Sequence, residues 1–399
     1  MTDSRFGWRA RHLGGQTSSA WDVQDEAVKR AGAAEPVLFL SIGDPDQATP
    51  SGIVDLAIDA LRAGRTHYSP VPGEPALRTA IAARLTRDTG RPAAAEQIVV
   101  FPGAQSALFS VISVLTGPGD QVIVAEPYYA TYPGVVAASG ATLVAAPAST
   151  ADGFRFDPSA VLACVTSHTK AILFSNPSNP TGATVGAQDL AALADLCRTR
   201  GIWLIADEVY SNLVYDTEHV SAWASADPNW TVVVNGMSKT YAMTGWRLGW
   251  AAGPADLAGH LTNLATASQF GCPQFIQDAS AAALDVECPE TVAMRDEYRR
   301  RRDYVVERTE GIPGLRALRP AGGMFVMLDV RAVCADDVAF AFDLLRQAQV
   351  AVIPGSGFGP AARGHVRLSL TQPIAVLEQA FDAIARYVRR VAPGVAPLR

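Results

Sequence analysis

The sequence reads KAILFSNPSNPTG at residues 170–182, IWLIADEVY at 202–210 and TVVVNGMSK at 231–239. Each stretch begins with a short apolar, β-rich run and ends in polar, Gly or Pro residues, as buried strands do. A helical spacing of apolar residues lies between the first two, over Ala187–Arg198. Strands that are apolar on both faces and separated by helices are typical of a mainly parallel sheet covered on both sides. The region therefore predicts an α/β fold whose ligands bind at the carboxyl ends of the strands.

The same alternation extends outward from this region. Further strands are expected at Gln97–Phe101, Gln121–Glu126 and Ala141–Ala146, and further helices at Asp55–Leu61, Ala76–Leu85, Ala104–Leu115 and Ala255–Ser268. After about residue 281 the pattern changes to a long charged helix over Glu290–Arg308, the strand-like runs RPAGGMFVMLDV, VAVIPGS and HVRLSL, a helix around Asp336–Gln347 and a final helix. We therefore predict a large domain over residues 46–280 and a smaller α+β domain over 281–399, with residues 1–45 forming an N-terminal arm and part of the small domain.

Composition excludes several classes of protein. The chain has 399 residues, of which 49% are hydrophobic and 18% charged, as in globular proteins, and a formal net charge of −6, which argues against nucleic-acid binding. No apolar run approaches the ~20 residues that span a bilayer, and the first residues lack the apolar segment of a secretory signal. The five cysteines are scattered and form no metal-binding motif, which predicts reduced thiols, no metal and a cytoplasmic location.

Lys239 follows a predicted strand and has unusual neighbours. A single lysine is most often a solvated surface residue, but here Gly236, Ser238 and Gly245 flank it and Arg247 follows eight residues later. Backbone N–H groups and a guanidinium in this arrangement suit a phosphate. A lysine desolvated at a strand end has a lowered pKa and forms a Schiff base with an aldehyde. This combination predicts a pyridoxal 5'-phosphate site.

Other strand ends supply the further groups that this cofactor requires. Asp207 is placed to keep the pyridine nitrogen protonated, and Asn179 and Tyr210 are suitable partners for the phenolic oxygen. Tyr129 is suited to stack on the cofactor ring. Taken singly these residues have ordinary explanations, because a strand-end Asp is often a helix cap and an Asn-Pro pair is usually a turn. Their common order along the chain favours a single site.

Two further features concern anions. Gly103, Ala104 and Gln105 open a predicted helix, where amide N–H groups and the helix dipole favour a phosphate. Arg367, in HVRLSL, has the fork geometry that binds a substrate carboxylate in a bidentate way.

Over essentially its whole length the chain resembles the class I/II aminotransferases, which are fold type I pyridoxal-phosphate enzymes. The motifs that carry the resemblance are SNPSNPTG, DEVYSNLVYD, SKTYAMTGWRLGW and the late VRLS arginine. It implies a homodimer with shared active sites, an amino acid and a 2-oxo acid as substrates, and a site composed as follows. By this resemblance, Lys239 is the Schiff-base lysine, Asp207 binds the pyridine nitrogen, Asn179 and Tyr210 bind the phenolic oxygen, and Tyr129 stacks on the ring. Arg367 binds the α-carboxylate of the substrate, and Gly43 lies near that carboxylate. The residues implied for the phosphate are Ala104, Gln105, Ser238 and Arg247, and Tyr68 reaches the phosphate of the neighbouring subunit. Gly236 departs from the family pattern, because many relatives carry a serine there.

Longer motifs resemble the arginine:pyruvate transaminases of arginine catabolism: SSAWDVQDEA, LFLSIGDPDQATP, DEVYSNLVYDTEHVSAWAS, FIQDASAAALD and MRDEYRRRRDYVVE. A guanidinium substrate needs carboxylates or aromatic faces in its pocket. The candidates near the expected entrance are Trp21, Asp22, Asp46 and Glu74, each of which has a capping or packing role as its alternative. The arginines of YRRRRDY are expected to form a solvated helix face.

The predicted function is transfer of the α-amino group of an L-amino acid, with L-arginine preferred, to a 2-oxo acid such as pyruvate by a ping-pong mechanism. Transamination of aspartate, an aromatic amino acid or alanine stays open, as does a lyase or oxidase reaction on an arginine-like amino acid. A transcription regulator needs a DNA-binding module, for which the sequence leaves no room. A dinucleotide-binding enzyme is disfavoured because no G-x-G-x-x-G motif follows the early strands.

Overall fold

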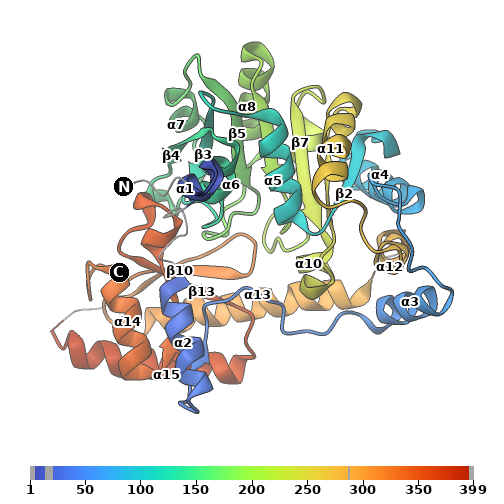
Figure 1. Ribbon diagram of the computed structural model, residues 1–399. Coiled ribbons are helices and arrows are strands. Elements are labelled where there is room, and N and C mark those ends of the chain that lie inside the picture. Colours follow the sequence, from blue (N-terminus) through green and yellow to red (C-terminus); the bar gives the residue numbers. More distant parts are fainter. Residues whose placement is uncertain (1–4, 14–20, 286–287, 395–399) are drawn as a thin grey trace.

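The computed structural model describes residues 5–13, 21–285 and 288–394. Its upper part in Figure 1 is built on a seven-stranded sheet. The strand order is β2 (Ile98–Phe101), β8 (Gly249–Ala252), β7 (Thr231–Gly236), β6 (Trp203–Asp207), β5 (Thr169–Ser175), β3 (Gln121–Glu126) and β4 (Thr142–Pro147). Neighbouring strands are parallel except where β8 pairs with β2 and β7, to both of which it is antiparallel. The six strands predicted for this region are all present, whereas β8 was not predicted.

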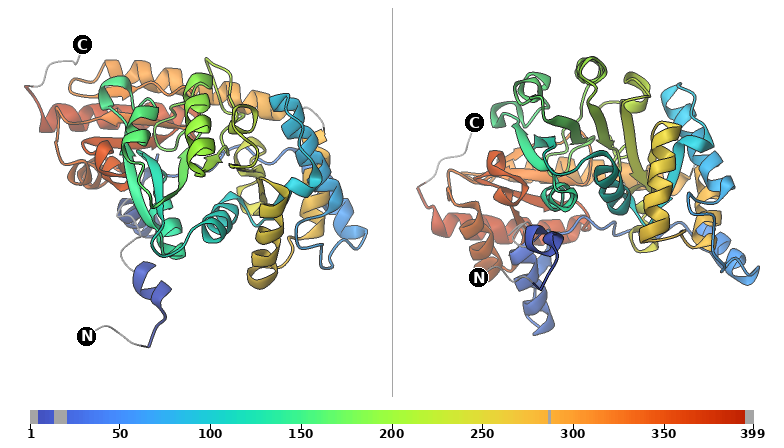
Figure 2. Two further views of the ribbon diagram at one scale, coloured as in Figure 1. Left: turned by 90° about the horizontal axis from the view of Figure 1, so that it is seen from above. Right: turned by 45° about the horizontal axis from the view of Figure 1, so that its top comes forward.

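Helices cover both faces of the sheet, because alternate side chains of each buried strand point to opposite sides. Val99 and Phe101 of β2 pack in one core, and Ile98 and Val100 pack in the other. The first core is covered by α5 (Ala104–Leu115), α6 (Tyr132–Ser139) and α11 (Ala255–Ser268), and the second by α3 (Ser51–Arg62), α4 (Pro75–Thr89), α7 (Pro158–Ala163), α8 (Ala187–Arg200), α9 (Ala222–Ser225) and α12 (Gln274–Asp285). The two views of Figure 2 show these helices on either side of the strands. The predicted three-layer α/β architecture is confirmed.

The lower part in Figure 1 is α+β, as predicted. Its antiparallel sheet has the order β12 (Ile353–Pro354), β13 (His365–Ser369), β10 (Phe325–Asp329) and β9 (Arg316–Leu318), and α13 (Pro289–Glu310), α14 (Asp337–Ala348) and α15 (Ile374–Val391) pack on it. The N-terminal segment joins this core: α2 (Asp22–Gly32) contributes Val23 and Ala27, and β1 (Leu38–Phe39) pairs in parallel with β11 (Val350–Ala351). The domain boundaries at residues 45/46 and 280/281 stay a prediction.

The shorter elements lie in the connections between these layers. They are the helices α1 (Trp8–Leu13) and α10 (Met237–Thr240) and the 3-10 turns Ala95–Gln97, Thr150–Asp152, Thr244–Trp246, Gly355–Phe358 and Pro360–Ala362. Within residues 5–13, 21–285 and 288–394, no helix has both the length and the apolarity needed to cross a bilayer.

Helix α13 runs beneath both parts of the molecule in Figure 1, and its arginines correct one prediction. Arg301 is buried and donates both of its terminal nitrogens to Asp46 at 2.8 Å. Arg302 is also buried, binds Asp216 and lies 4.8 Å above the ring of Tyr215. The prediction of a solvated helix face is wrong for these two residues. Neighbouring elements cover their side of the helix, and each buried guanidinium is paired with a carboxylate.

Candidate active site

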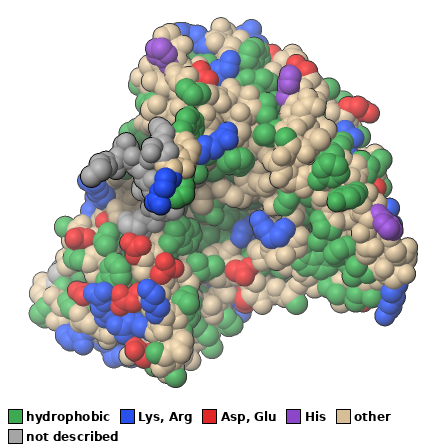
Figure 3. Space-filling model, viewed as in Figure 1, with side chains coloured by type: hydrophobic (Ala, Val, Ile, Leu, Met, Phe, Trp, Pro, Cys, Tyr) green, Lys and Arg blue, Asp and Glu red, His purple; other side chains and the backbone are tan. Residues whose placement is uncertain are grey.

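A pocket of about 340 Å³ lies between the carboxyl ends of the parallel strands and the lower part of the molecule. Figure 3 shows the hollow between the two parts, with basic side chains at its edge. The volume falls in the range of small-molecule sites. The residues predicted for the site that line it are Gly43, Ala104, Gln105, Tyr129, Asn179, Asp207, Tyr210, Ser238, Lys239, Arg247 and Arg367. The topology therefore collects residues that are more than three hundred positions apart into one pocket.

Lys239 lies in α10, directly after β7, and its side chain enters the pocket. Its Nζ donates a hydrogen bond to the carbonyl oxygen of Gly43 at 2.6 Å. Burial lowers the pKa of Lys239 to about 8, and the positive charges of Arg367 and Arg247 act in the same direction. The chain has two other lysines, Lys29 and Lys170, and both are exposed. Lys239 is thus the lysine placed to react as a free amine near neutral pH.

This pKa gives a testable pH dependence. An amine reacts with an aldehyde in its neutral form, so attachment of pyridoxal phosphate to the cofactor-free protein should accelerate about tenfold per pH unit up to pH ~8 and level off above it. Stopped-flow absorption after mixing measures the rate. A rate that keeps rising to pH ~10, where an ordinary lysine titrates, would contradict the desolvation of Lys239.

Asp207 ends β6 and is buried at the floor of the pocket. Burial raises the pKa of its carboxyl group to about 6. The opposing contribution comes from Tyr132, whose hydroxyl donates to Asp207 Oδ2 at 2.8 Å. Sequence analysis missed Tyr132, because an aromatic residue on an apolar helix reads as ordinary core. The hydrogen bond from the buried Tyr132 therefore fixes the orientation of the Asp207 carboxylate.

Arg367 lies in β13 and is almost completely buried. It donates to Asn179 Oδ1 at 2.9 Å and to the carbonyl oxygen of Ser41 at 2.6 Å, and its guanidinium lies 4.0 Å from the ring centre of Phe325. Within the described residues no carboxylate pairs with it, and its Nε has no hydrogen-bond partner. Burial lowers its pKa to about 10, so it stays charged at neutral pH. A buried, unpaired guanidinium that lines a pocket is suited to bind a carboxylate of a ligand.

The other end of the pocket is suited to a phosphate. Helix α5 starts after Gly103, and the amide N–H groups of its first turn, at Ala104 and Gln105, lack intrahelical acceptors as at any helix start. Arg247 donates to the carbonyl oxygen of Thr244 at 2.7 Å and lies against this helix start. Gly103 has φ +88°, and a Cβ there would lie 2.5 Å from the Arg247 guanidinium. Gly103 therefore allows Arg247 to lie close to the start of α5, although Gly103 itself does not line the pocket.

Gly236 is closely packed. A Cβ at this position would lie 2.9 Å from the carbonyl oxygen of Leu248 in the chain entering β8. This close approach of backbone explains why the chain has glycine here. Ser238 lines the pocket and is the hydroxyl available nearby.

Tyr68 lies outside this pocket. Its side chain is 86% exposed and packs edge-on against Phe270, with ring centres 5.2 Å apart. Its role toward a neighbouring subunit stays a prediction.

Of the residues considered as partners for a cationic substrate side chain, one lines the pocket and three do not. Trp21 lines the pocket, whereas Asp22 is exposed on α2. Asp46 pairs with Arg301, and Glu74 is buried and accepts a hydrogen bond from Gln274. Asp46 and Glu74 therefore take the alternative role given for them, since both carboxylates are bound elsewhere and neither lines the pocket. Besides Asp207, the pocket is lined by the carboxylate of Asp44, which stands two residues before Asp46 in the sequence and accepts a hydrogen bond from Thr244 at 2.6 Å.

The family model for aminotransferase class I and II matches residues 35–384, which is most of the chain. The chain belongs to this family. It is 47% identical over 382 residues to an arginine–pyruvate transaminase of Pseudomonas aeruginosa, a match that covers 96% of this chain and 97% of that relative. It is 37% identical to an aspartate/prephenate aminotransferase of Thermus thermophilus, with 92% and 95% covered.

Solved structures agree with the sequence comparison. A single mutant of Thermus thermophilus aspartate aminotransferase superposes with a TM-score of 0.91 at 35% identity, covering 96% of this chain and 99% of that one. The Rhizobium meliloti aspartate aminotransferase gives a TM-score of 0.92 at 31% identity, covering 97% and 100%. The chain is therefore a pyridoxal-phosphate-dependent aminotransferase with the fold of its class.

The residues present fit this cofactor. A desolvated lysine, a buried carboxylate and a phosphate cradle at a helix start lie around one pocket. A carboxylate-binding arginine completes the set on the opposite side.

Proposed function

We propose that this aminotransferase moves the α-amino group of L-arginine to pyruvate or a similar 2-oxo acid by a ping-pong mechanism. The observation that carries the proposal is the near full-length likeness to a relative whose name states both substrates. The other relatives compared, which are named for aspartate or for aspartate and prephenate, are less similar, at 32% to 37% identity. Substrate preference changes with few residues in such a pocket, so the side-chain contacts need separate support.

In the proposed site each residue has a defined task. Pyridoxal phosphate supplies an electron sink and an amino-group carrier when bound. Lys239 would hold its aldehyde and, once released, move a proton at the substrate Cα, because Nζ is buried and has a lowered pKa. Asp207 would bind the protonated ring nitrogen, and the phosphate would lie against Ser238, Arg247 and the start of α5.

The remaining residues would orient the reactants. Asn179 and Tyr210 would bind the phenolic oxygen, and Tyr129 would stack on the ring. Arg367 would hold the α-carboxylate, which leaves the substrate side chain to point away from it. The absence of a carboxylate partner for Arg367 in the described residues supports this assignment.

We propose that Asp44 binds the guanidinium of the donor, with Trp21 as a neighbouring aromatic face. Asp44 is a pocket-lining carboxylate that the cofactor does not require, whereas Asp207 is assigned to the ring nitrogen. Charge-assisted hydrogen bonds of this kind contribute about 1.5–3 kcal/mol.

Asp44→Asn should therefore lower kcat/KM for L-arginine by about 10- to 100-fold and change kcat/KM for L-alanine much less. Asp44 also acts electrostatically on Lys239, so the ratio of the two substrates is the quantity to measure. An equal loss for both amino acids would remove Asp44 from substrate recognition. Asp22→Asn, on the exposed face of α2, is the matched control.

The reaction type is tested by its products. Purified enzyme with L-arginine and pyruvate should yield alanine and the 2-oxo acid of arginine in equal amounts. Without pyruvate, the enzyme should consume no more than one equivalent of arginine per site. Ammonia release without an acceptor would indicate a lyase, and oxygen consumption would indicate an oxidase. Faster turnover of aspartate or an aromatic donor would replace arginine and keep the aminotransferase assignment.

We also propose a cytoplasmic homodimer with shared active sites. Its support is the exposure of Tyr68 and Phe270 side by side, together with the five unpaired cysteines, which suit a reducing compartment. Sedimentation gives the oligomeric state. Mixing inactive Tyr68 and Lys239 variants tests sharing, because shared sites would restore partial activity in the mixed dimers.

A further inference from the structure

Tyr132 contacts two residues of the proposed site from behind. It is the first residue of α6 and is 1% exposed. Its hydroxyl donates to Asp207 Oδ2 at 2.8 Å. Among the described residues this is the sole side-chain hydrogen bond to Asp207, whose other partner is the amide of Val209 at a longer 3.4 Å.

The ring of Tyr132 also supports Tyr129. The two rings meet edge to face, with centres 5.8 Å apart and planes at 87°. The backbone adds to this contact, because the amide of Tyr132 donates to the carbonyl oxygen of Tyr129 at 2.9 Å. One buried side chain thus holds the carboxylate at the floor of the pocket and the aromatic ring at its wall.

We propose that Tyr132 is a positioning residue for the cofactor: its hydroxyl keeps Asp207 ionised and oriented, and its ring fixes Tyr129. This inference rests on the roles proposed above for Asp207 and Tyr129. Tyr132 itself lines a separate small cavity and not the cofactor pocket, so it acts through its two neighbours.

The electrostatics around Asp207 explain why the hydroxyl matters. Burial raises the pKa of Asp207 to about 6, and the charge of Glu208 acts in the same direction. The hydrogen bond from Tyr132 opposes both, while Tyr129 and Tyr210 face the carboxylate as neutral phenols whose pKa values burial raises. The cations that line the same pocket are Lys239, Arg247 and Arg367.

Loss of the hydroxyl should therefore raise the pKa of Asp207 further. The carboxylate is ionised above its pKa and becomes neutral as the pH falls through it, so the higher pKa moves this change toward neutral pH. A neutral Asp207 cannot stabilise a protonated ring nitrogen.

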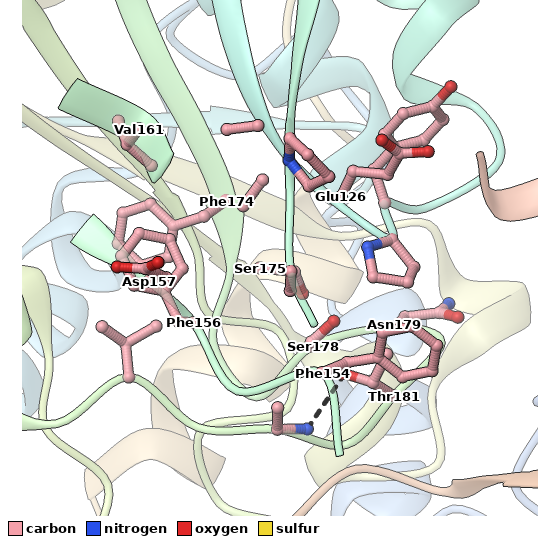
Figure 4. Close-up of a pocket in the computed structure, with 18 of the residues that line it drawn as sticks. Glu126, Phe154, Phe156, Asp157, Val161, Phe174, Ser175, Ser178, Asn179 and Thr181 are labelled. Atoms are coloured by element: carbon pink, nitrogen blue, oxygen red, sulfur yellow. Dashed lines mark hydrogen bonds between the residues drawn. The ribbon is translucent and has the colours of Figure 1, made fainter. Parts of the chain in front are cut away.

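We expect Tyr132→Phe to keep the fold, because it enlarges the small cavity that Tyr132 lines by only one hydroxyl oxygen. The small cavity has a volume of about 30 Å³, which is room for one or two water molecules. Figure 4 shows it between the rings of Phe154, Phe156 and Phe174 and the polar side chains of Ser175 and Asn179. A phenylalanine is smaller than tyrosine by one oxygen atom and keeps the edge-to-face contact with Tyr129.

The test compares Tyr132→Phe, Asp207→Ala and the double variant. Cofactor affinity is measured by titrating the cofactor-free proteins with pyridoxal phosphate, and the pH dependence of the visible spectrum is recorded for each. We expect Tyr132→Phe to weaken cofactor binding by about 10-fold, to move the spectral transition of the bound cofactor to higher pH and to lower kcat/KM alike for all amino acids. Tyr387→Phe removes a hydroxyl from the small-domain core and is the matched control. The double variant should bind the cofactor as Asp207→Ala does.

The outcomes separate the two levels of the argument. If Asp207→Ala leaves cofactor affinity unchanged, the proposed role of Asp207 is wrong. If Asp207→Ala weakens binding but Tyr132→Phe behaves like Tyr387→Phe, the role of Tyr132 is wrong. A further loss in the double variant would show that the hydroxyl acts through something other than Asp207 and would also overturn the inference. Thermal unfolding of the cofactor-free variants reports folding independently of these readouts.

Discussion

Replacing Lys239 by alanine should abolish transamination and the covalent attachment of the cofactor. Lys239 is the buried lysine whose Nζ enters the pocket, so neither of the other two lysines is placed to bind the aldehyde or to move the Cα proton. We expect kcat to fall by at least about 10⁴-fold, the upper range for loss of a general base, with further loss from the missing attachment. Steady-state assays and the visible spectrum measure the two effects.

Lys170→Ala is the matched control, because Lys170 is exposed at the start of β5 and should be dispensable. Reduction of the loaded wild-type enzyme with borohydride, followed by peptide mass analysis, locates the attachment site. The cofactor mass should appear on the peptide that contains Lys239. Its appearance on Lys29 or Lys170, or an unaltered spectrum in Lys239→Ala, would overturn the assignment of the site.

Arg367→Leu should lower kcat/KM for every amino acid by about 10²- to 10³-fold. The buried guanidinium would lose a bidentate, charge-assisted contact with the substrate carboxylate, and such desolvated pairs cost 2–5 kcal/mol or more when one partner is removed. Because every α-amino acid presents the same carboxylate, the loss should be similar for arginine, aspartate and alanine. Initial rates over a range of each donor give the ratios.

Arg390→Leu serves as the control for this variant, since Arg390 is exposed at the end of α15 and binds Gln347. A loss confined to aspartate would assign Arg367 to a substrate side chain. An unchanged kcat/KM would mean that another residue holds the α-carboxylate.

Much of the fold could be predicted because the buried strands of a parallel sheet are continuous apolar runs. The runs that end at Ser175, Asp207 and Gly236 became β5, β6 and β7, and their polar ends met at one pocket. Strand β8 escaped prediction because GWAA is short and overlaps the end of a motif that was interpreted for its Arg247. Its antiparallel pairing with β2 and β7 depends on contacts between distant segments.

The errors and omissions share this long-range origin. Asp44 and Asp46 stand two residues apart in a segment without regular periodicity, and only the fold decides that one lines the pocket while the other pairs with Arg301. Tyr132 and Asp207 are 75 positions apart, and nothing local marks their hydrogen bond. The functional side chains at strand ends can therefore be predicted from the sequence. The residues that orient these side chains cannot, because tertiary packing brings them together.

The half-reaction with L-arginine alone tests the central claim most directly. Enzyme loaded with pyridoxal phosphate is mixed with L-arginine without any 2-oxo acid while the visible absorption of the bound cofactor is followed, and pyruvate is then added. We predict that arginine removes the yellow absorption within one turnover, faster than aspartate or an aromatic amino acid does, and that pyruvate restores it with formation of one alanine per site. Absorption that persists with arginine and is removed by another donor, or a loss that pyruvate does not reverse, would contradict the account.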